Sequence, residues 1–266
     1  MKSLKETMKG FDLEEIRKRA NSLSSTSKTE PAQDKQYRCS KCKDDEFIIV
    51  RKEDGTEFAI PCECRNEKAA ERLLKSSKIT PEFQSKGFKN FRREGRPKAV
   101  LDAFQAAWNY VQDLDDRNTP NKSIALLGRP GCGKTHLLMA ISNNLLAKGT
   151  QVLYFPFVEG FNEIKANLDS LEQRIYQLQQ AQVLYIDDLF KGRKEITDFV
   201  IEQTFAIINY RYLEKKPILI SSEKTIAELC QIDEAIGSRI NEMCWDYLVI
   251  LKGGIELNYR LRSKEG

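Results

Sequence analysis

The chain from residue 97 onward shows a regular alternation of two hydrophobic patterns. Short apolar runs of four or five residues predict β-strands at 123–127, 152–155, 183–186, 217–220 and 247–251. Between them, apolar residues recur every three or four positions and predict helices at 135–148, 161–180 and 197–213, with shorter ones around Ala227 and Ser238. Strands that alternate with helices pack into a parallel sheet covered on both faces. The pattern therefore predicts an α/β fold.

The part before residue 97 lacks this alternation. Apolar residues at 47–50 and 58–60 flank Asp54-Gly55, a typical tight turn, and predict a β-hairpin. A Ser/Thr-rich stretch precedes it, and a basic stretch follows it. We therefore expect four parts: a short helix and flexible tether at 1–36, a small module at 37–64, a basic connector at 65–96 and the α/β domain at 97–266.

The strand expected at 123–127 runs directly into a glycine-rich sequence that fits G-x-x-x-x-G-K-T at every fixed position. Glycines let backbone N–H groups turn inward around phosphates, and the following helix adds the positive end of its dipole. Lys134 is expected to reach the β- and γ-phosphates of ATP, and the Thr135 hydroxyl to bind Mg²⁺. The predicted phosphate loop consists of Gly128, Arg129, Pro130, Gly131, Cys132, Gly133, Lys134 and Thr135.

A pair of acidic residues follows the strand expected at 183–186. An apolar strand that delivers a carboxylate to the carboxyl edge of a parallel sheet meets the needs of Mg²⁺ beside a phosphate loop. Asp187 is therefore the predicted Mg²⁺ ligand, and Asp188 is the candidate base that orients the attacking water. The alternative is an acidic pair that only starts a loop.

Four of the seven cysteines form two close pairs around the predicted hairpin. Paired cysteines in a reducing compartment are more typical of metal binding than of disulfides. Two pairs separated by a hairpin resemble a zinc ribbon, although a closing C-x-C is less common than C-x-x-C. The absence of a histidine or carboxylate from the pattern favours a structural rather than a catalytic zinc. The predicted Zn²⁺ ligands are Cys39, Cys42, Cys62 and Cys64.

The charge distribution is informative only when it is read locally. The net charge is +4, yet the stretch 65–98 holds eleven Lys/Arg against four Asp/Glu. Such a stretch favours a polyanionic partner such as nucleic acid, with a solvated helix and linker as the alternative. No apolar run approaches the roughly 20 residues that span a bilayer, and no secretion signal is recognised. We therefore expect a cytoplasmic protein without a membrane partner.

Taken together, these motifs resemble the DnaC/DnaI helicase loaders of bacteria and their phages. The resemblance covers about 37–262 and rests on the cysteine module, the basic connector and the sequences GRPGCGKTHL and LYIDDL. It implies an AAA+ ATPase that opens or holds a hexameric replicative DNA helicase and delivers it to single-stranded DNA. It also implies a homo-oligomer on ATP or DNA binding, with the N-terminal module gripping the helicase. The divergent sequence favours a phage or prophage version.

The resemblance assigns roles to two arginines and exposes one departure. Arg239 lies in G-S-R-I, which is similar to the family's box for an arginine finger that reaches a neighbour's ATP. Arg260 ends N-Y-R, which is similar to the Ser-Tyr-Arg ending that carries a nucleotide-sensing arginine. Surface ion pairing is the alternative for both. After the strand at 217–220, the family's Thr-Ser-Asn is replaced by Ser-Ser-Glu, so that either Ser222 senses the γ-phosphate or Glu223 repels it and slows hydrolysis.

Other functions remain open at this point. A transposition helper ATPase of the IstB type has a very similar core, a small-molecule kinase shares the phosphate loop, and a nucleotide-gated adaptor would bind ATP with little turnover. Only fifteen residues, 252–266, follow the last predicted strand, so we expect no C-terminal lid domain and disfavour a DnaA-type initiator. DNA contacts could lie in the basic connector or within 161–176, where Phe161 and Tyr176 either stack on bases or pack in the core.

Overall fold

The computed structural model describes residues 37–52, 54–113, 122–192 and 196–261. The chain divides into two compact units, Met1–Cys62 and Glu63–Gly266. The short helix and tether expected within 1–36 lie outside the described residues.

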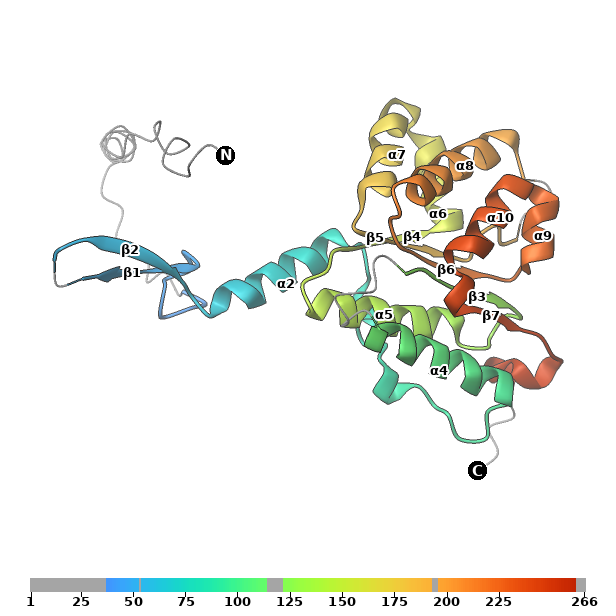
Figure 1. Ribbon diagram of the computed structural model, residues 1–266, viewed down its shortest axis with the longest axis horizontal. Helices are drawn as coiled ribbons and strands as arrows, with labels where there is room; N and C mark the ends of the chain where they lie inside the picture. The colour runs from blue at the N-terminus through green and yellow to red at the C-terminus, as the bar shows by residue number, and fades with distance from the viewer. Residues whose placement is uncertain (1–36, 53, 114–121, 193–195, 262–266) are drawn as a thin grey trace, which may run out of the picture. The chain divides into compact units, whose positions relative to one another are not determined.

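In the first unit, two antiparallel strands, β1 (Phe47–Arg51) and β2 (Glu57–Pro61), form the predicted hairpin (Figure 1). Gly55 has a φ of 83°, which glycine adopts without strain, and the Asp54 carboxylate accepts hydrogen bonds from the backbone and hydroxyl of Thr56. An isolated hairpin with little buried apolar surface is marginal in water. This hairpin therefore needs another source of stability, because four of its large apolar side chains remain exposed: Phe47, Ile49, Phe58 and Ile60.

The second unit is built on a parallel sheet of five strands in the order β4-β5-β6-β3-β7. Each strand lies at a predicted position, which confirms the α/β fold. Because all five run parallel, the carboxyl ends of β3, β5 and β6 meet at one edge of the sheet. This brings the phosphate loop and the acidic pair together. The strands are β3 (Ile124–Gly128), β4 (Val152–Pro156), β5 (Val183–Asp187), β6 (Ile218–Ser222) and β7 (Leu248–Leu251).

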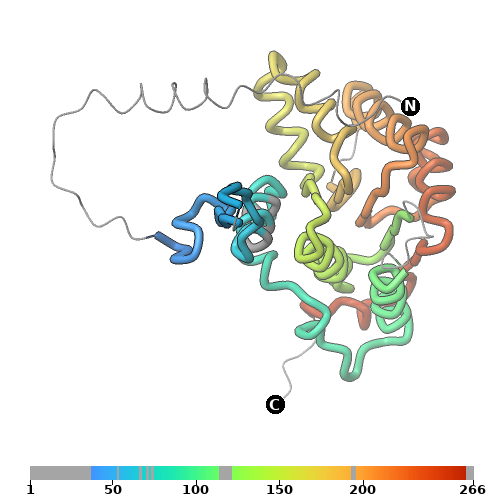
Figure 2. Tube along the Cα trace, turned by 60° about the vertical axis from the view of Figure 1, so that its left-hand side comes forward, coloured from blue at the N-terminus to red at the C-terminus, as the bar shows by residue number. Residues whose placement is uncertain are grey.

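Helices cover both faces of this sheet, α4 and α5 on one and α6 to α10 on the other (Figures 1 and 2). Strand side chains alternate between the two layers: Leu126 packs in the cluster with α4 and α5, and the adjacent Leu127 in the other. Both faces are therefore apolar, as the continuous hydrophobic runs predict. The helices are α4 (Lys98–Asp113), α5 (Lys134–Ala147), α6 (Phe157–Ala166), α7 (Leu171–Gln180), α8 (Asp198–Leu213), α9 (Ile226–Ile232) and α10 (Glu234–Met243).

The segment 161–180 is largely helical, as predicted, but it is not one continuous helix. The structure has α6 and α7 there, joined by a 3-10 turn at Leu168–Ser170. Asn167 has non-helical dihedral angles, and its carbonyl accepts a hydrogen bond from the Ser170 hydroxyl. Short polar side chains that bond the local backbone compete with the helix, and this polar turn ends α6. Phe161 is buried in the core, whereas Tyr176 on α7 is 61% exposed.

Residues 65–96, expected as a separate connector, belong to the same compact unit as the sheet. They include α2 (Cys64–Ser76), α3 (Pro81–Gln84) and a 3-10 turn at Phe88–Asn90. The backbone N–H of Tyr154 on β4 donates to the Ser77 carbonyl at 2.8 Å. The Asn143 amide on α5 donates to three carbonyls of this stretch, those of Phe83, Gln84 and Lys86. Much of the basic stretch is therefore a wall of the core.

After β7, the described chain continues as two 3-10 turns, Ile255–Leu257 and Tyr259–Leu261. As expected, no helical lid domain is present in the part of the chain that the structure describes. Within that same part, every helix is too short or too polar to cross a membrane.

Arg211 on α8 is a fully buried cation that holds three elements together. Its guanidinium donates to carbonyls at and beyond the end of α7 and, at 2.6 Å, to Pro217 just before β6. Burial lowers the pKa of Arg211 to about 9, which leaves the group charged at neutral pH. A cation at a helix C-terminus satisfies unpaired carbonyls and complements the helix dipole. At and beyond the end of α7, the guanidinium donates to the carbonyls of Leu178, Gln179, Ala181 and Gln182.

We predict that Arg211→Met lowers the free energy of unfolding by about 3 kcal/mol, because several buried carbonyls lose their donor at once. Glu202→Met, an exposed change on the same helix, should have little effect and serves as the control. Denaturant unfolding of both variants makes the measurement. If Arg211→Met and the unmodified protein had equal free energies of unfolding, the buried guanidinium would make no net contribution to stability.

Candidate nucleotide-binding site

The predicted phosphate loop connects β3 to α5 and approaches two other parts of the fold closely. Gly128 has a φ of 105°, and a Cβ there would lie 2.5 Å from the Leu251 carbonyl oxygen on β7. Gly133 has a φ of 98°, and a Cβ there would lie 2.7 Å from the Phe91 ring. Both positions therefore require glycine for conformation and for space. The loop is fixed between β7 on one side and the 65–96 stretch on the other.

Lys134 begins α5 and is buried. Its ammonium group donates to the carbonyl oxygens of Gly128 and Arg129, each at 2.7 Å, so it is held against the loop it serves. Burial lowers the pKa of Lys134, and the nearby carboxylates of Asp188 and Glu223 partly offset this effect. The structure therefore places a cation at the centre of the loop, where the phosphate pattern predicts it.

Asp187 ends β5 and is the most heavily hydrogen-bonded carboxylate of the site. It accepts from the hydroxyl groups of Thr135 at 3.1 Å, Tyr154 at 3.1 Å, Tyr185 at 2.8 Å and Ser221. Burial raises the pKa of Asp187, while the bonds from Ser221, Tyr185 and Thr135 act in the opposite direction. Thr135 and Asp187, the two predicted Mg²⁺ ligands, are thus in direct contact. Oxygen donors on adjacent elements are a donor set that suits Mg²⁺.

The two tyrosines at Asp187 were not predicted as site residues. Tyr154 and Tyr185 are register partners on the neighbouring strands β4 and β5, and their rings pack 5.2 Å apart. In the sequence they look like ordinary core aromatics. The signal that could have identified them is that each tyrosine lies in an apolar strand, where a buried hydroxyl needs a partner.

Asp188 and Glu223 share a cation that was also not predicted. Lys191 lies 2.7 Å from a carboxylate oxygen of Asp188 and 3.4 Å from one of Glu223. The bare negative charge expected at Glu223 is therefore paired. Glu223 lines the cleft, whereas Ser222, the candidate phosphate sensor, is buried, and its hydroxyl donates to the Leu189 carbonyl.

These residues line a cleft of about 720 Å³ whose second wall comes from the 65–96 stretch. Phe91 packs edge-on against the His136 ring, with centroids 5.2 Å apart. The His136 Nε2 atom lies 3.0 Å from the Gly87 carbonyl oxygen and 3.1 Å from the Asn90 side-chain oxygen. Sequence reasoning missed this wall, because nothing in the pattern of a basic stretch shows which core it folds against.

The chain's closing residues complete the cleft. Arg92 donates to the Tyr259 hydroxyl at 2.9 Å, and the buried Arg96 stacks over the Tyr259 ring. Arg260 follows directly and also lines the cleft. The predicted sensing arginine therefore lines the same cleft as the phosphate loop.

Comparison with known proteins agrees with this geometry. The family model for IstB-like ATP binding proteins matches residues 63–243, which include the phosphate loop and the acidic pair. The chain belongs to this family. Together with the five-stranded parallel sheet and the phosphate loop, membership makes this IstB-like chain an ATP-binding ATPase of the AAA+ kind.

This IstB-like chain is also similar to individual known proteins. The phage-like element PBSX protein XkdC of Bacillus subtilis is 49% identical and covers 86% of this chain and 88% of its own length. The replicative helicase loader DnaC of Escherichia coli is 26% identical over 74% of this chain and 78% of its own. A crystal structure of DnaI is 23% identical, with a TM-score of 0.53 over 66% of this chain and 95% of the other. At that identity the match shows a shared fold.

Arg239 lies away from the cleft of its own chain. On α10 of this IstB-like domain, its guanidinium donates to the Asn209 side chain at 3.0 Å and to the Ala235 carbonyl at 2.9 Å. It also lies over the rings of Phe205 and Tyr212, 5.3 and 5.4 Å from their centroids. The structure therefore brings Lys134, Asp187, Asp188 and Arg260 to one cleft and leaves Arg239 outside it.

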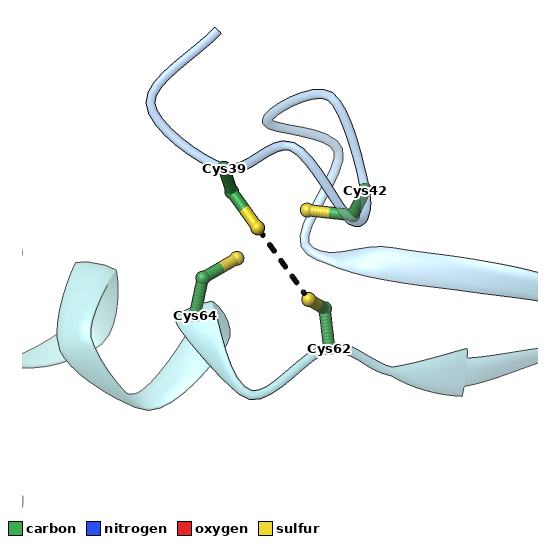
Figure 3. A group of neighbouring side chains, drawn as sticks. All are labelled: Cys39, Cys42, Cys62 and Cys64. Atoms are coloured by element: carbon green, nitrogen blue, oxygen red, sulfur yellow. Dashed lines mark hydrogen bonds between the residues drawn. The ribbon is translucent and has the colours of Figure 1, made fainter.

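The four predicted zinc ligands also come together. All four thiol sulfurs lie within 4.8 Å of one another, and those of Cys39 and Cys62 are 3.8 Å apart (Figure 3). A tetrahedral site with Zn–S bonds of 2.3 Å requires sulfurs about 3.8 Å apart. Figure 3 shows the thiols converging from the loop before β1, the end of β2 and the first residue of α2. The donor set and its spacing fit a closed Zn²⁺ site.

His136 is the only histidine of the chain, so its titration can be followed without interference. Burial lowers its pKa from 6.5, an effect larger than the opposing hydrogen bond with Gly87. We predict an imidazole titration with a midpoint below 6.5, measured by NMR. The unfolded chain then binds the proton more readily, so this group lowers stability as the pH falls below 6.5.

Removing the ring that covers His136 tests the cause. Phe91→Ala should move the midpoint up toward 6.5, whereas Phe58→Ala on the hairpin should leave it unchanged. A midpoint at or above 6.5 in the unmodified protein would contradict the buried setting of His136.

Proposed function

We propose that this protein is an ATP-dependent loader that places a hexameric replicative DNA helicase on single-stranded DNA. The observation that carries the proposal is the similarity to the helicase loader DnaC, which extends along 74% of the chain rather than over the phosphate loop alone. The similarity to a phage-like element protein supports a phage or prophage setting.

The nucleotide would be bound and hydrolysed by the residues gathered at the cleft. Lys134 would contact the β- and γ-phosphates, and Thr135 and Asp187 would hold Mg²⁺. Asp188 would orient the attacking water and accept its proton. Arg260, which lines the same cleft, would contact the bound nucleotide. This set divides charge compensation, metal binding and proton transfer among separate side chains.

Arg239 would act on the ATP of a neighbouring subunit. Its distance from its own cleft supports a role in trans, and its contacts with Asn209, Phe205 and Tyr212 would hold the guanidinium ready at low entropic cost. A finger of this kind requires a homo-oligomer formed on ATP or DNA binding. The rate of ATP hydrolysis would then depend on assembly of the homo-oligomer.

Single-stranded DNA would be bound by the part of the basic stretch that does not form the cleft. Arg92 and Arg96 are committed to the nucleotide wall through Tyr259. A track of exposed basic residues would follow phosphates, and the exposed ring of Tyr176 on α7 offers a surface for base stacking. The exposed basic positions of this stretch outside the cleft wall are Arg65, Arg72, Lys75, Lys78, Lys89 and Arg93.

The zinc-stabilised hairpin would grip the helicase. Both of its faces are apolar, with the pair Ile49–Ala59 on one and Val50–Phe58 on the other. Ile49 is 71% exposed, which is unusual for a side chain of its type. Exposed apolar surface on a small rigid module suits a protein partner.

We predict one Zn²⁺ per chain, bound by the four converging thiols. Elemental analysis of protein purified without chelators should find it, and Cys62→Ser should lose it and loosen the hairpin while ATP binding persists. Cys230→Ser, outside the cluster, should keep the metal. Zinc-free preparations with an intact hairpin would exclude the metal site.

The helicase test uses the full chain on a sizing column with the host replicative helicase and ATP. The unmodified protein should co-elute, and Ile49→Asp should lose most of the complex, because a buried carboxylate without a partner costs several kcal/mol. Arg51→Ser, a polar change on the same strand, should retain it. Lys134→Ala should fail to load the helicase onto single-stranded DNA, because the β- and γ-phosphates lose their cation.

A transposition helper of the IstB type is the second candidate, and the name of the matching family favours it. The matched residues 63–243 leave out the hairpin and three of its four cysteines. Binding to a transposase with no helicase in the complex would favour this candidate. Co-elution with the helicase that fails in Ile49→Asp would exclude it.

A further inference from the structure

The edge of the cleft beyond Lys134 carries an excess of negative charge. Asp187, Asp188 and Glu223 all line it, at the ends of the adjacent strands β5 and β6. An incoming terminal phosphate would add to this charge and be repelled. Lys191 is the cation that lies between Asp188 and Glu223. Its position therefore decides whether a terminal phosphate contacts a cation or only carboxylates there.

Lys191 can exchange its two carboxylate partners for a phosphate. Its ammonium is 2.7 Å from Asp188 and 3.4 Å from Glu223, and all three side chains are 30–40% exposed at the cleft. Burial disfavours the charged lysine, but the hydrogen bond and charges of these carboxylates outweigh it and raise the pKa of Lys191. Lys191 therefore remains a cation at neutral pH, in pairs that water and a phosphate can compete for.

The backbone that carries Lys191 is fixed. Leu189 and Phe190 just before it are fully buried. The Leu189 N–H donates to the Ser221 carbonyl at 2.9 Å, and the Leu189 carbonyl accepts from the Ser222 hydroxyl at 2.7 Å. Phe190 has a φ of 55°, which a bulky residue keeps only when its surroundings hold it. A change of partner is therefore a swing of the flexible lysine side chain and not of the loop.

We propose that Lys191 is a second phosphate-binding cation, which leaves Asp188 and Glu223 for the terminal phosphate of bound ATP and returns to them once that phosphate is gone. Glu223 keeps the cation at the cleft between cycles. ADP lacks the group that draws Lys191 away, so this exchange lets the site distinguish ATP from ADP. The inference rests on the proposed role of Asp188 but not on the helicase.

The exchange also controls the base. In hydrolysis, the water oxygen bonds to the terminal phosphorus while the bond to the bridging oxygen breaks, giving ADP and phosphate, and the water proton passes to Asp188. While the Lys191 ammonium group donates to Asp188, one oxygen of that carboxylate is occupied by the lysine rather than by the attacking water. Movement of Lys191 to the phosphate therefore frees Asp188 only when a phosphate is present to be attacked.

The test measures the affinity of the full chain for a non-hydrolysable ATP analogue and for ADP. Lys191→Gln should weaken binding of the ATP analogue about tenfold or more, because a charge-assisted contact is lost, and leave ADP within about twofold. Retained ADP binding also shows that the variant is folded. Lys215→Gln, an exposed lysine after α8, should change neither affinity. An unchanged ratio of the two affinities in Lys191→Gln would overturn the proposal.

A second variant separates phosphate contact from simple neutralisation of Glu223. If Lys191 only neutralises Glu223, the double variant Lys191→Gln/Glu223→Gln regains the original ratio, and the proposal is wrong. If Lys191 contacts the phosphate, the double variant stays deficient, and Glu223→Gln alone binds the ATP analogue more tightly because the competitor is gone. Failure of the unmodified protein to bind either nucleotide would instead refute the ATP site itself.

Discussion

The hydrogen bonds to the buried carboxylate of Asp187 are the interaction on which the rest of the structure depends. A charge in that position is unfavourable unless donors surround it. They come from α5, β4, β5 and β6, so that four elements are tied at one point. The strand order β4-β5-β6-β3 allows this. It places β4 and β6 on either side of β5, and only β6 separates β5 from β3, which leads into the phosphate loop.

The wall formed by residues 77–96 changes how the basic character of the chain is understood. Positive charge in this region first suggests an external polyanion, but Arg96 is buried, donates to the Cys132 carbonyl and supports the phosphate loop from behind. Part of the positive charge is thus structural and serves the nucleotide. Other basic residues of the 65–96 stretch lie on exposed positions, among them Arg65, Arg72 and Lys75.

The sequence alone predicts the features that depend only on residues close together along the chain. The five strands, the phosphate loop and the cysteine cluster follow from local periodicity or fixed spacing. The tyrosines at Asp187, the wall at His136 and the pairing of Lys191 with Glu223 depend on strand order and on contacts between distant residues, which no local pattern encodes. The expected repulsion at Glu223 shows the difference: the residue was correctly singled out, but its partner lies 32 positions earlier. The position of the break between α6 and α7 does not follow from the pattern, because apolar periodicity continues across a polar turn.

Arg211 has a mechanical consequence. Its guanidinium joins the end of α7 to Pro217, and β6, which starts one residue later, ends beside Glu223 at the cleft. A five-residue strand is short and stiff. The position of the C-terminal end of α7 is therefore coupled, through one buried side chain, to the start of the strand that leads to the rim of the nucleotide cleft.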